Sequence, residues 1–363
     1  MVIDTRANPR AAFLRSGFLL VALCWAAAGF AAASVEGNKK PAQAPRQPQP
    51  SELMPLADHT IVNDMARAGD HLVAVGARGD ILLSRNGKTW HQVVGPVRSM
   101  LTRVVFRDNE HGWAVGWDGA ILHTSDGGRH WDLVNFDPQW GKPYFDVMPT
   151  GPGAAVVIGS NGRMRITDDA GKTWRKVDND VFATGFHLYE IDALADGTLL
   201  IAGERGMLAR SIDGSHWDML VPPYIGSYFG VIPWGPHGAV LYGLQGRVFV
   251  AEDVRTLPAL DKPMAYSPFT AKNITDAARL AAMGWRQIRN PVEESLYGAS
   301  LDSSGRLILV GVDGSIVAGQ VTDSELQAQD SPTTDPLSDV LVQDHGLLLS
   351  GRNGFYHGKL PGR

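Results

Sequence analysis

The sequence predicts an all-β fold: a seven-bladed β-propeller of four-stranded antiparallel blades, closed by the N-terminal strand. A Gly-x-x-Gly motif between two apolar strands recurs seven times in one frame along the 363 residues. The 41 glycines and 22 prolines suit many short strands joined by tight turns. Repeats of about 40 residues that each supply four strands are typical of propeller blades, because one such sheet cannot bury both of its faces alone.

The N-terminal 33 residues have the features of a secretory signal peptide. Arg6, Arg10 and Arg15 precede an uninterrupted run of apolar and small residues from Gly17 to Ala33, which ends in a small-residue cleavage pattern. The run is also at the short limit for a membrane span, so a retained anchor is the alternative. We expect residues 1–33 to be a signal peptide and the protein to be exported.

The next segment, residues 34–50, is rich in Pro, Gln and Lys, which predicts a flexible linker before a propeller domain at residues 51–363. The one cysteine, Cys24, lies inside the signal peptide, so the mature chain is expected to have neither a disulfide nor a cysteine metal site. These features predict a periplasmic or lumenal protein that is soluble after signal cleavage and associates with a membrane through a partner protein.

The seven repeats share one template of four short strands. The first glycines of the seven motifs are Gly76, Gly116, Gly159, Gly203, Gly243, Gly311 and Gly351. An apolar residue 14 or 15 positions upstream opens an earlier strand, and in four repeats a tryptophan 14 or 15 positions downstream precedes a last, short strand.

The ends of the repeat array predict how the ring closes. The last repeat stops after its third strand, Phe355 to Leu360, whereas an orphan strand-like stretch, Glu52 to Ala57, precedes the first repeat. We expect residues 52–57 to pair as the outermost strand of the last blade, because an unclosed ring would leave strand edges exposed.

Four repeats carry a similar turn between their third and fourth strands. Two have the form Ser/Thr-x-Asp-x-Gly-x-x-Trp, at residues 124–131 and 167–174, and two are one residue shorter, at residues 84–90 and 211–217. An Asp side chain can accept backbone N–H groups there, glycine permits positive φ, and the tryptophan can pack between blades. We expect structural rather than catalytic roles for Asn86, Trp90, Asp126, Trp131, Asp169, Trp174, Asp213 and Trp217.

This turn resembles the Asp-box (BNR) repeat, which also occurs in sialidases, sortilin-type receptors and some glucanases. One seven-bladed domain behind an export signal is most similar to the photosystem II assembly and stability factor family, over about residues 52–360. The resemblance implies a non-catalytic factor that binds a membrane-protein client through an arginine-bearing patch. Relatives occur in bacteria without photosystems, so the client is either a photosystem subunit or another assembly such as an export complex.

The seven Gly-x-x-Gly turns must lie on one face of the ring, because strand direction repeats in every blade. The turns and their close neighbours mix arginines, carboxylates, amides and one tryptophan: Arg78, Trp117, Asp118, Asn161, Arg163, Glu204, Arg205, Gln245, Arg247, Asp313, Arg352 and Asn353. Arg and Trp are enriched among binding hot spots, so this set, the turn ring, is a candidate partner-binding surface. An ordinary solvated turn surface is the alternative.

Repeat five departs from the template. Trp285 follows Gly243 by 42 residues, which places an insertion at about residues 252–284 between the third and fourth strands of blade five. Residues 273–283 predict a short helix within it. The insertion either binds a partner or only caps the ring edge, and three of its apolar residues would then anchor a partner or pack on blade five: Met264, Tyr266 and Phe269.

The main enzymatic alternative is a glycosidase or sialidase-like enzyme that acts in the central channel. Its inner strands offer Arg103, Asp146, Glu190 and Asp339, and a glycosidase needs two carboxylates at a set separation. The Arg-Ile-Pro stretch characteristic of sialidases is absent from the sequence. We therefore expect no catalytic residues.

The sequence also argues against other ligands. Its 11 histidines are scattered without a pair at metal-ligand spacing on one element, and no Gly-rich phosphate cradle leads from a strand into a helix. The net charge of −5 does not suit a nucleic-acid binder. The prediction is a monomeric, non-catalytic scaffold or assembly factor that uses no metal or cofactor.

Overall fold

The computed structural model describes residues 46–138, 142–344 and 346–361. The predicted signal peptide, residues 1–33, and most of the predicted linker lie outside the described residues.

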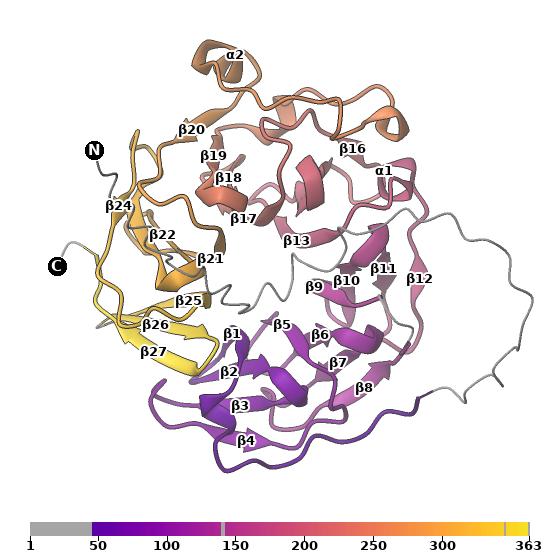
Figure 1. The fold of residues 1–363 in the computed structure, drawn as a ribbon. Coiled ribbons are helices and arrows are strands. Elements are labelled where there is room, and N and C mark those ends of the chain that lie inside the picture. The colour runs from indigo at the N-terminus through magenta and orange to yellow at the C-terminus, as the bar shows by residue number, and fades with distance from the viewer. Residues whose placement is uncertain (1–45, 139–141, 345, 362–363) are drawn as a thin grey trace, which may run out of the picture. The chain divides into compact units, whose positions relative to one another are not determined.

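Residues 46–361 form seven antiparallel sheets arranged around a centre, which confirms the seven-bladed β-propeller (Figure 1). Each sheet keeps its strands in sequence order from the centre outward. The innermost strands are β1 (Val62–Ala68), β5 (Leu101–Phe106), β9 (Tyr144–Gly151), β13 (Leu188–Ala193), β17 (Tyr228–Trp234), β21 (Leu296–Leu301) and β25 (Leu337–Gln343).

The second strands are β2 (His71–Gly76), β6 (Gly112–Gly116), β10 (Ala154–Gly159), β14 (Leu199–Gly203), β18 (Gly238–Gly243), β22 (Arg306–Gly311) and β26 (Gly346–Gly351). The third strands are β3 (Ile81–Ser84), β7 (Ile121–Thr124), β11 (Met164–Thr167), β15 (Leu208–Ser211), β19 (Val248–Ala251), β23 (Ile316–Gln320) and β27 (Gly354–Gly358). The outermost strands are β4 (His91–Val93), β8 (Asp132–Asn135), β12 (Arg175–Lys176), β16 (Asp218–Met219), β20 (Arg286–Ile288) and β24 (Gln327–Ala328).

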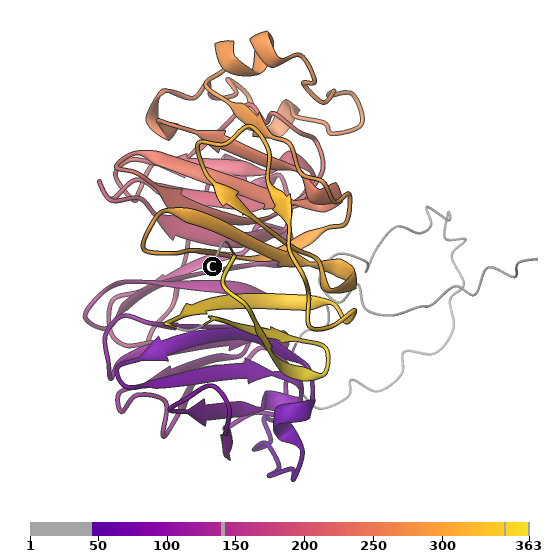
Figure 2. The ribbon, with the colours of Figure 1, turned by 90° about the vertical axis from the view of Figure 1, so that its left-hand side faces the viewer.

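The core lies between the blades. The second strands are almost continuous apolar runs, and every residue of β2, β6 and β18 is buried, because a neighbouring blade covers each face of the sheet. Trp285 of blade five, for example, packs with Leu200 and Leu208 of blade four. Seen from the rim, the blades stack side by side and their strands run between the two faces of the ring (Figure 2).

The predicted closure by an N-terminal strand is wrong. Blade seven has three strands, and residues 52–57 form no strand with β27. The segment binds the outer side of blade one instead: Ser51 N–H donates to Gly95 O at 2.9 Å, and Met54 N–H donates to Gln92 Oε1 at 2.7 Å.

Proline and packing explain this difference. Pro55 lacks the N–H that a ladder needs, and the chain then turns into a 3-10 helix, η1 (Ala57–His59), which lies against one end of β27. The ring closes through blade faces instead. Met65 and Leu348 share one core cluster, and Met65 N–H donates to Asp339 Oδ2 across the junction of blades one and seven.

The blade-five insertion is a packed segment. It contains 3-10 helices η7 (Val254–Thr256) and η8 (Pro263–Ala265) and helix α2 (Ala277–Ala282), and Ile274 and Leu280 are buried in it. The guanidinium of Arg210 in blade four donates to three backbone carbonyls at its start, those of Val254, Arg255 and Leu257. A second short helix, α1 (Asp180–Ala183), links blades three and four.

Candidate docking face and central channel

Six of the seven Gly-x-x-Gly turns share one backbone conformation. Their third residues are left-handed, with φ between 53° and 60°: Arg78, Asp118, Asn161, Arg205, Gln245 and Asp313. In the first of these turns both glycines are sterically required, because a Cβ on Gly76 would lie 1.9 Å from Ile61 O and one on Gly79 would lie 1.9 Å from Val97 O. The motif is therefore set by close backbone contacts within the ring.

The turn of blade seven differs. Gly351 pairs directly with Gly354, so Arg352 and Asn353 form a two-residue hairpin turn, one residue shorter than the others. Asn353 does not have the positive φ of its six counterparts. The sequence motif is the same, so only the pairing register reveals this difference.

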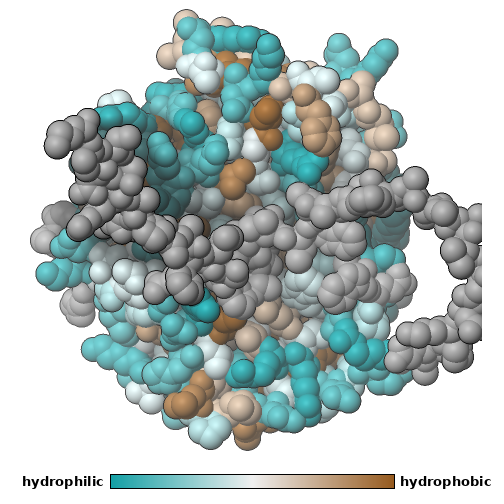
Figure 3. Space-filling view, in the orientation of Figure 1, coloured by the Kyte–Doolittle hydropathy of each residue, from teal (hydrophilic) through white to brown (hydrophobic). Residues whose placement is uncertain are grey.

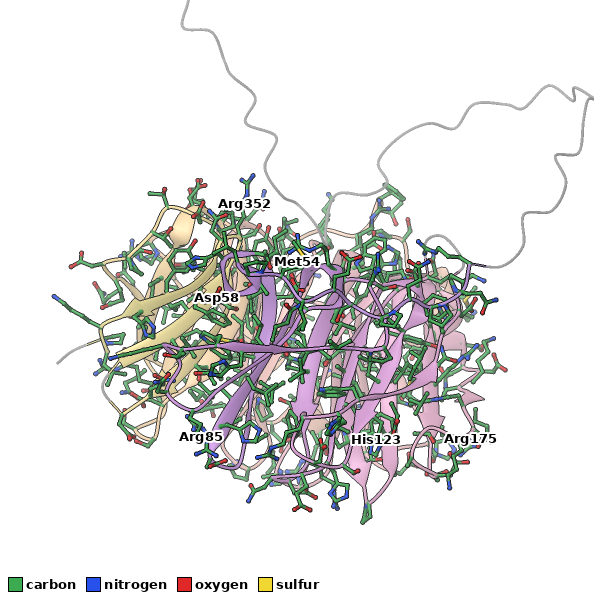
Figure 4. The ribbon with its side chains drawn as sticks, turned by 90° about the horizontal axis from the view of Figure 1, so that it is seen from below. Met54, Asp58, Arg85, His123, Arg175 and Arg352 are labelled. Carbon is green, nitrogen blue, oxygen red and sulfur yellow. The ribbon has the colours of Figure 1, made fainter. Side chains whose placement is uncertain are left out.

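The turn ring lies at one face of the propeller. Arg352 lies at that face in Figure 4, whereas Arg85, His123 and Arg175 lie at the opposite face. Figure 3 views the face of the turn ring, where apolar residues form separate patches among hydrophilic ones.

The predicted turn-ring residues divide into exposed and partly buried ones. Exposed are Arg78, Asn161, Gln245, Arg247, Asp313, Arg352 and Asn353, and partly buried are Trp117, Asp118, Arg163, Glu204 and Arg205. Arg163 is the most engaged, because its guanidinium donates to Tyr144 Oη and to Lys142 O and lies 4.5 Å from the Tyr144 ring centroid. The contacts of Arg163 therefore stabilise blade three, and its guanidinium is less accessible to a partner than those of the exposed arginines.

The insertion reaches the turn ring at blade four. Tyr266 Oη donates to Arg205 O at 3.0 Å, and the Phe269 ring centroid lies 5.3 Å from the Arg205 guanidinium carbon. Phe269 is 84% exposed and Met264 is 60% exposed. Tyr266 thus packs on blade four and not on blade five, which was one of the two roles expected for it, and the exposed Phe269 lies beside Arg205.

One arginine lies among the carboxylates of the central channel. The Arg103 guanidinium is 3.3 Å from Asp64 Oδ1, 3.2 Å from Asp146 Oδ1 and 2.6 Å from Glu190 Oε1. These three carboxylates come from the inner strands of blades one, three and four. Arg103 therefore connects four blades, through charge-assisted hydrogen bonds to Asp64 and Glu190 and an ion pair with Asp146.

The same carboxylates also bind backbone. Asp64 accepts the N–H of Val104, Asp146 that of Ile191, Glu190 that of Val231 and Asp339 that of Met65, each in the next blade along the ring. A carboxylate two residues into an inner strand thus hydrogen-bonds its blade to the following one. Asp64 was not among the channel residues that we expected from the sequence, although its position in the repeat matches that of Asp146.

Burial dominates the electrostatics of this cluster. It raises the pKa of Asp64 and that of Asp146 to about 7 and the pKa of Asp339 to about 6, and the Arg103 charge only partly offsets the effect. The carboxylates in turn raise the pKa of Arg103 well above its usual value, although burial alone would lower it. The arrangement is a buried structural network, with no carboxylate left free of a backbone or arginine partner.

Four aromatic rings line the channel at the turn-ring end. Successive ring centroids are 5.5 Å apart for Phe145 and Tyr189, 5.6 Å for Tyr189 and Phe229, and 5.3 Å for Phe229 and Tyr297. Each residue directly follows the first residue of an inner strand, which pairs with the first glycine of a turn. We call these four residues the aromatic arc. An aromatic residue at one repeat position in four consecutive repeats was the signal that sequence reasoning missed.

The other blades use the same position differently. In these blades the side chain donates a hydrogen bond to the backbone carbonyl of the first inner-strand residue of the next blade. The pairs are Asn63 to Leu101 O, Thr102 to Tyr144 O and Ser338 to Val62 O. At the channel mouth, three blades therefore present polar side chains that are bonded to backbone, and the other four present aromatic ones.

The Asp-box residues lie at the opposite face, away from the turn ring. Asp126 Oδ1 accepts the N–H of His130 at 2.9 Å, and Trp131 Nε1 donates to Gly128 O at 2.9 Å. Asn86, Asp169 and Asp213 accept equivalent backbone bonds in their turns. The geometry suits turn stabilisation, and no group of three or more metal-ligating side chains gathers among residues 46–138, 142–344 and 346–361.

Comparisons with known proteins agree with this geometry. The family model described as "Photosynthesis system II assembly factor YCF48" matches residues 81–231. The chain is 25% identical over 189 residues to the chloroplastic photosystem II stability/assembly factor HCF136 of Oryza sativa subsp. japonica, covering 48% of this chain and 45% of that protein. It is 29% identical over 164 residues to the photosystem II assembly protein Ycf48 of Synechococcus sp. (strain JA-2-3B'a(2-13)), covering 32% and 48%.

Each match therefore spans less than half of the relative's length. Among solved structures, "YCF48 bound to D1 peptide" aligns with a TM-score of 0.60 and 17% identity over 86% of this chain and 99% of that chain. The WD40 propeller domain of Doa1 aligns almost as well, with a TM-score of 0.59 and 12% identity over 84% and 94%. The structural likeness shows the fold, a β-propeller, and the sequence matches show similarity to photosystem II assembly factors over less than half of this chain.

Proposed function

We propose that this chain is a non-catalytic scaffold that docks a membrane-protein client through its turn-ring face and so helps to assemble or stabilise a complex. The exposed turn-ring residues surround a channel mouth that is half lined by the aromatic arc. Arginine and aromatic side chains are the groups that most often dominate protein interfaces. An extended client segment with acidic and apolar side chains fits this chemistry.

The observation that carries the proposal is the contrast between this face and the channel. The turn ring offers exposed polar and cationic groups on rigid turns, whereas the channel carboxylates that a hydrolase would need already bind Arg103 or backbone. The photosystem II assembly proteins among its relatives favour a photosystem-type client.

The proposed location is the periplasm or lumen, after export by the N-terminal segment. The parts of the chain that the structure describes contain no helix long and apolar enough to cross a bilayer. A monomer without cofactor or metal suffices for this role.

The test compares charge reversal on the two faces. Arg205→Glu with Arg247→Glu alters the turn ring, and Arg85→Glu with Arg175→Glu is the matched control on the opposite face (Figure 4). Two probes are used: proteins recovered with the chain from detergent-solubilised membranes, and the D1 peptide of the related solved complex.

Loss of a membrane protein from the turn-ring variant alone supports docking by this face. Binding of the D1 peptide that weakens at least about tenfold in the same variant assigns a photosystem client. Equal recovery from both variants, or equal loss, contradicts the proposal.

A further inference from the structure

Blade seven leaves a strand edge uncovered. Its sheet ends at β27, whereas the other six blades each have a fourth strand, and among residues 46–361 nothing forms a ladder with the outer edge of β27. Among the described residues, η1 packs against this strand at its Gly354 end, where a Cβ would lie 1.9 Å from Asp58 O. The rest of the edge faces outward at the rim (Figures 1 and 2).

The hairpin geometry identifies the outward backbone groups. Gly351 and Gly354 flank a two-residue turn and bond to each other, so the N–H and C=O groups of alternate residues, Phe355 and His357, point away from β26. The complete blades show the same alternation. The residue equivalent to Phe355 in each blade pairs with the residue just before the first glycine, as Ser350 does here.

In three complete blades, the carbonyl of that equivalent residue accepts an N–H from the fourth strand. Met164 O accepts from Val177 at 3.0 Å, Leu208 O from Leu220 at 2.8 Å, and Ile316 O from Gln329 at 2.8 Å. Phe355 O is the corresponding acceptor in blade seven, and no described residue donates to it.

The edge lacks the usual protection against pairing. Natural edge strands are blunted by Lys, Pro or inward charges, whereas β27 reads Gly-Phe-Tyr-His-Gly. Elsewhere in the molecule an outer edge is covered: Leu220 at the edge of blade four pairs with Ala259 of the insertion, and Leu260 N–H donates to Met219 O at 2.7 Å. The rim of this propeller thus accepts added extended segments.

The six existing fourth strands define the chemistry of an occupant. Each follows a large apolar residue: Trp90, Trp131, Trp174, Trp217, Trp285 or Leu326. The residue opposite the His357 equivalent is always polar: His91, Asp132, Arg175, Asp218, Arg286 or Gln327. Four of the six sequences continue to an aliphatic residue opposite the Phe355 equivalent: Val93, Val177, Leu220 and Ile288.

The apolar slot of blade seven is only partly filled. In complete blades the tryptophan packs toward the preceding blade, as Trp285 does. In blade seven, Leu360 packs against a core cluster that includes Ile316 and Ala318 of blade six and Leu347 of its own blade. A single leucine, half-buried, thus lies in the cluster where five of the other six blades place a tryptophan.

We propose that the outer edge of β27 binds an extended segment of another protein with the pattern Trp–polar–any–aliphatic, antiparallel to β27, as the fourth strand of blade seven. Backbone hydrogen bonds to Phe355 and His357 provide affinity, and the tryptophan and aliphatic side chains provide specificity. A second copy of β27 fits less well, because its sequence offers no aliphatic residue for the position opposite Phe355. This surface is separate from the turn ring.

The probe is a fluorescently labelled peptide with the sequence of residues 173–178, Thr-Trp-Arg-Lys-Val-Asp, and its binding to the full chain is followed by anisotropy. In the expected register the peptide valine donates its N–H to Phe355 O, as Val177 does to Met164 O. N-methylation of that valine should weaken binding about tenfold, whereas N-methylation of the adjacent lysine, whose N–H points away, should leave it within about twofold.

Protein variants test the same contact from the other side. His357→Pro removes an outward N–H and should abolish binding, while His357→Ala keeps the backbone donor and should retain it. Leu360→Ala should strengthen binding because it empties the slot for the peptide tryptophan.

Three outcomes overturn the proposal. They are absence of peptide binding, equal affinity of the two methylated peptides, and a homodimer in sedimentation velocity that His357→Pro dissociates, since a second copy would then occupy the edge. The methylated peptides keep the test valid even if His357→Pro fails to fold.

Discussion

The indole of Trp90 lies flat on the ring of Phe355, with centroids 3.9 Å apart and an interplanar angle of 5°. Trp90 belongs to the first repeat and Phe355 to the last, so this stack joins the two ends of the repeat array. It takes the place of the closing strand that the sequence predicted. Offset stacking of aromatic rings contributes about 0.5–1.5 kcal/mol beyond the buried area.

Phe355→Ala should therefore loosen the junction between blades one and seven. Because Phe355 is half-buried, we expect a loss of roughly 2 kcal/mol in the free energy of unfolding, less than for a fully buried Phe. Faster amide hydrogen exchange should be confined to β1, β26 and β27. Phe269→Ala, at a side chain that is 84% exposed, is the control and should change stability by less than about 0.5 kcal/mol.

Arg103→Met tests the channel network. Removal of the cation leaves carboxylates from three other blades buried without their counter-charge, which should cost about 3–5 kcal/mol in chemical denaturation. Arg67→Met, at an exposed position of β1, is the matched control. If both variants unfold at the same denaturant concentration, Arg103 does not hold the blades together.

The raised pKa values predict how stability depends on pH. Asp64 and Asp146 have folded-state pKa values of about 7 and Asp339 of about 6, all above the unfolded value near 3.8, so the folded state binds more protons between those limits. This contribution is fully present below about pH 4 and is lost as the pH rises through 6 to 7. In thermal unfolding, Tm should fall between pH 5 and pH 8, and the fall should be steeper in Arg103→Met. A Tm that rises over this interval would contradict the assignment.

Gly162→Ala tests the steric origin of the turn motif. The new Cβ would lie 1.9 Å from Phe182 O at a φ of 66°, so both a backbone clash and left-handed strain oppose folding, and the loss should exceed about 4 kcal/mol. Gly197→Ala has a similar φ of 86° but nothing within 4 Å, and should cost only about 1–2 kcal/mol. Equal denaturation midpoints for the two variants would remove the steric explanation.

The sequence predicted the blades because repetition sums weak local signals. The close backbone contact that fixes Gly76 recurs at the first glycine of each other blade, so the motif marks each turn. The segment at residues 52–57 occurs only once in the sequence. Its position depends on Pro55 and on contacts with blade one that the repeat pattern does not predict.

The face of the propeller that carries the candidate site could be predicted from the sequence, but the contacts of its side chains could not. Strand direction places every turn on one face, whereas the engagement of Arg163 by Tyr144 depends on tertiary packing. The aromatic arc could have been found only by comparing the second residue of the inner strand across all repeats. Packing of Tyr266 on blade four was not among the roles expected for it, because the sequence does not show where a long insertion folds back.

Site-specific photo-crosslinking tests the central claim most directly. A photoreactive residue replaces Gln245 in the turn ring or Lys88 in the opposite face, both exposed, in otherwise intact chains within the source cells. The account predicts that one membrane protein crosslinks through position 245 and not through position 88. Crosslinking through position 88 alone, or equally through both positions, would contradict docking by the turn-ring face.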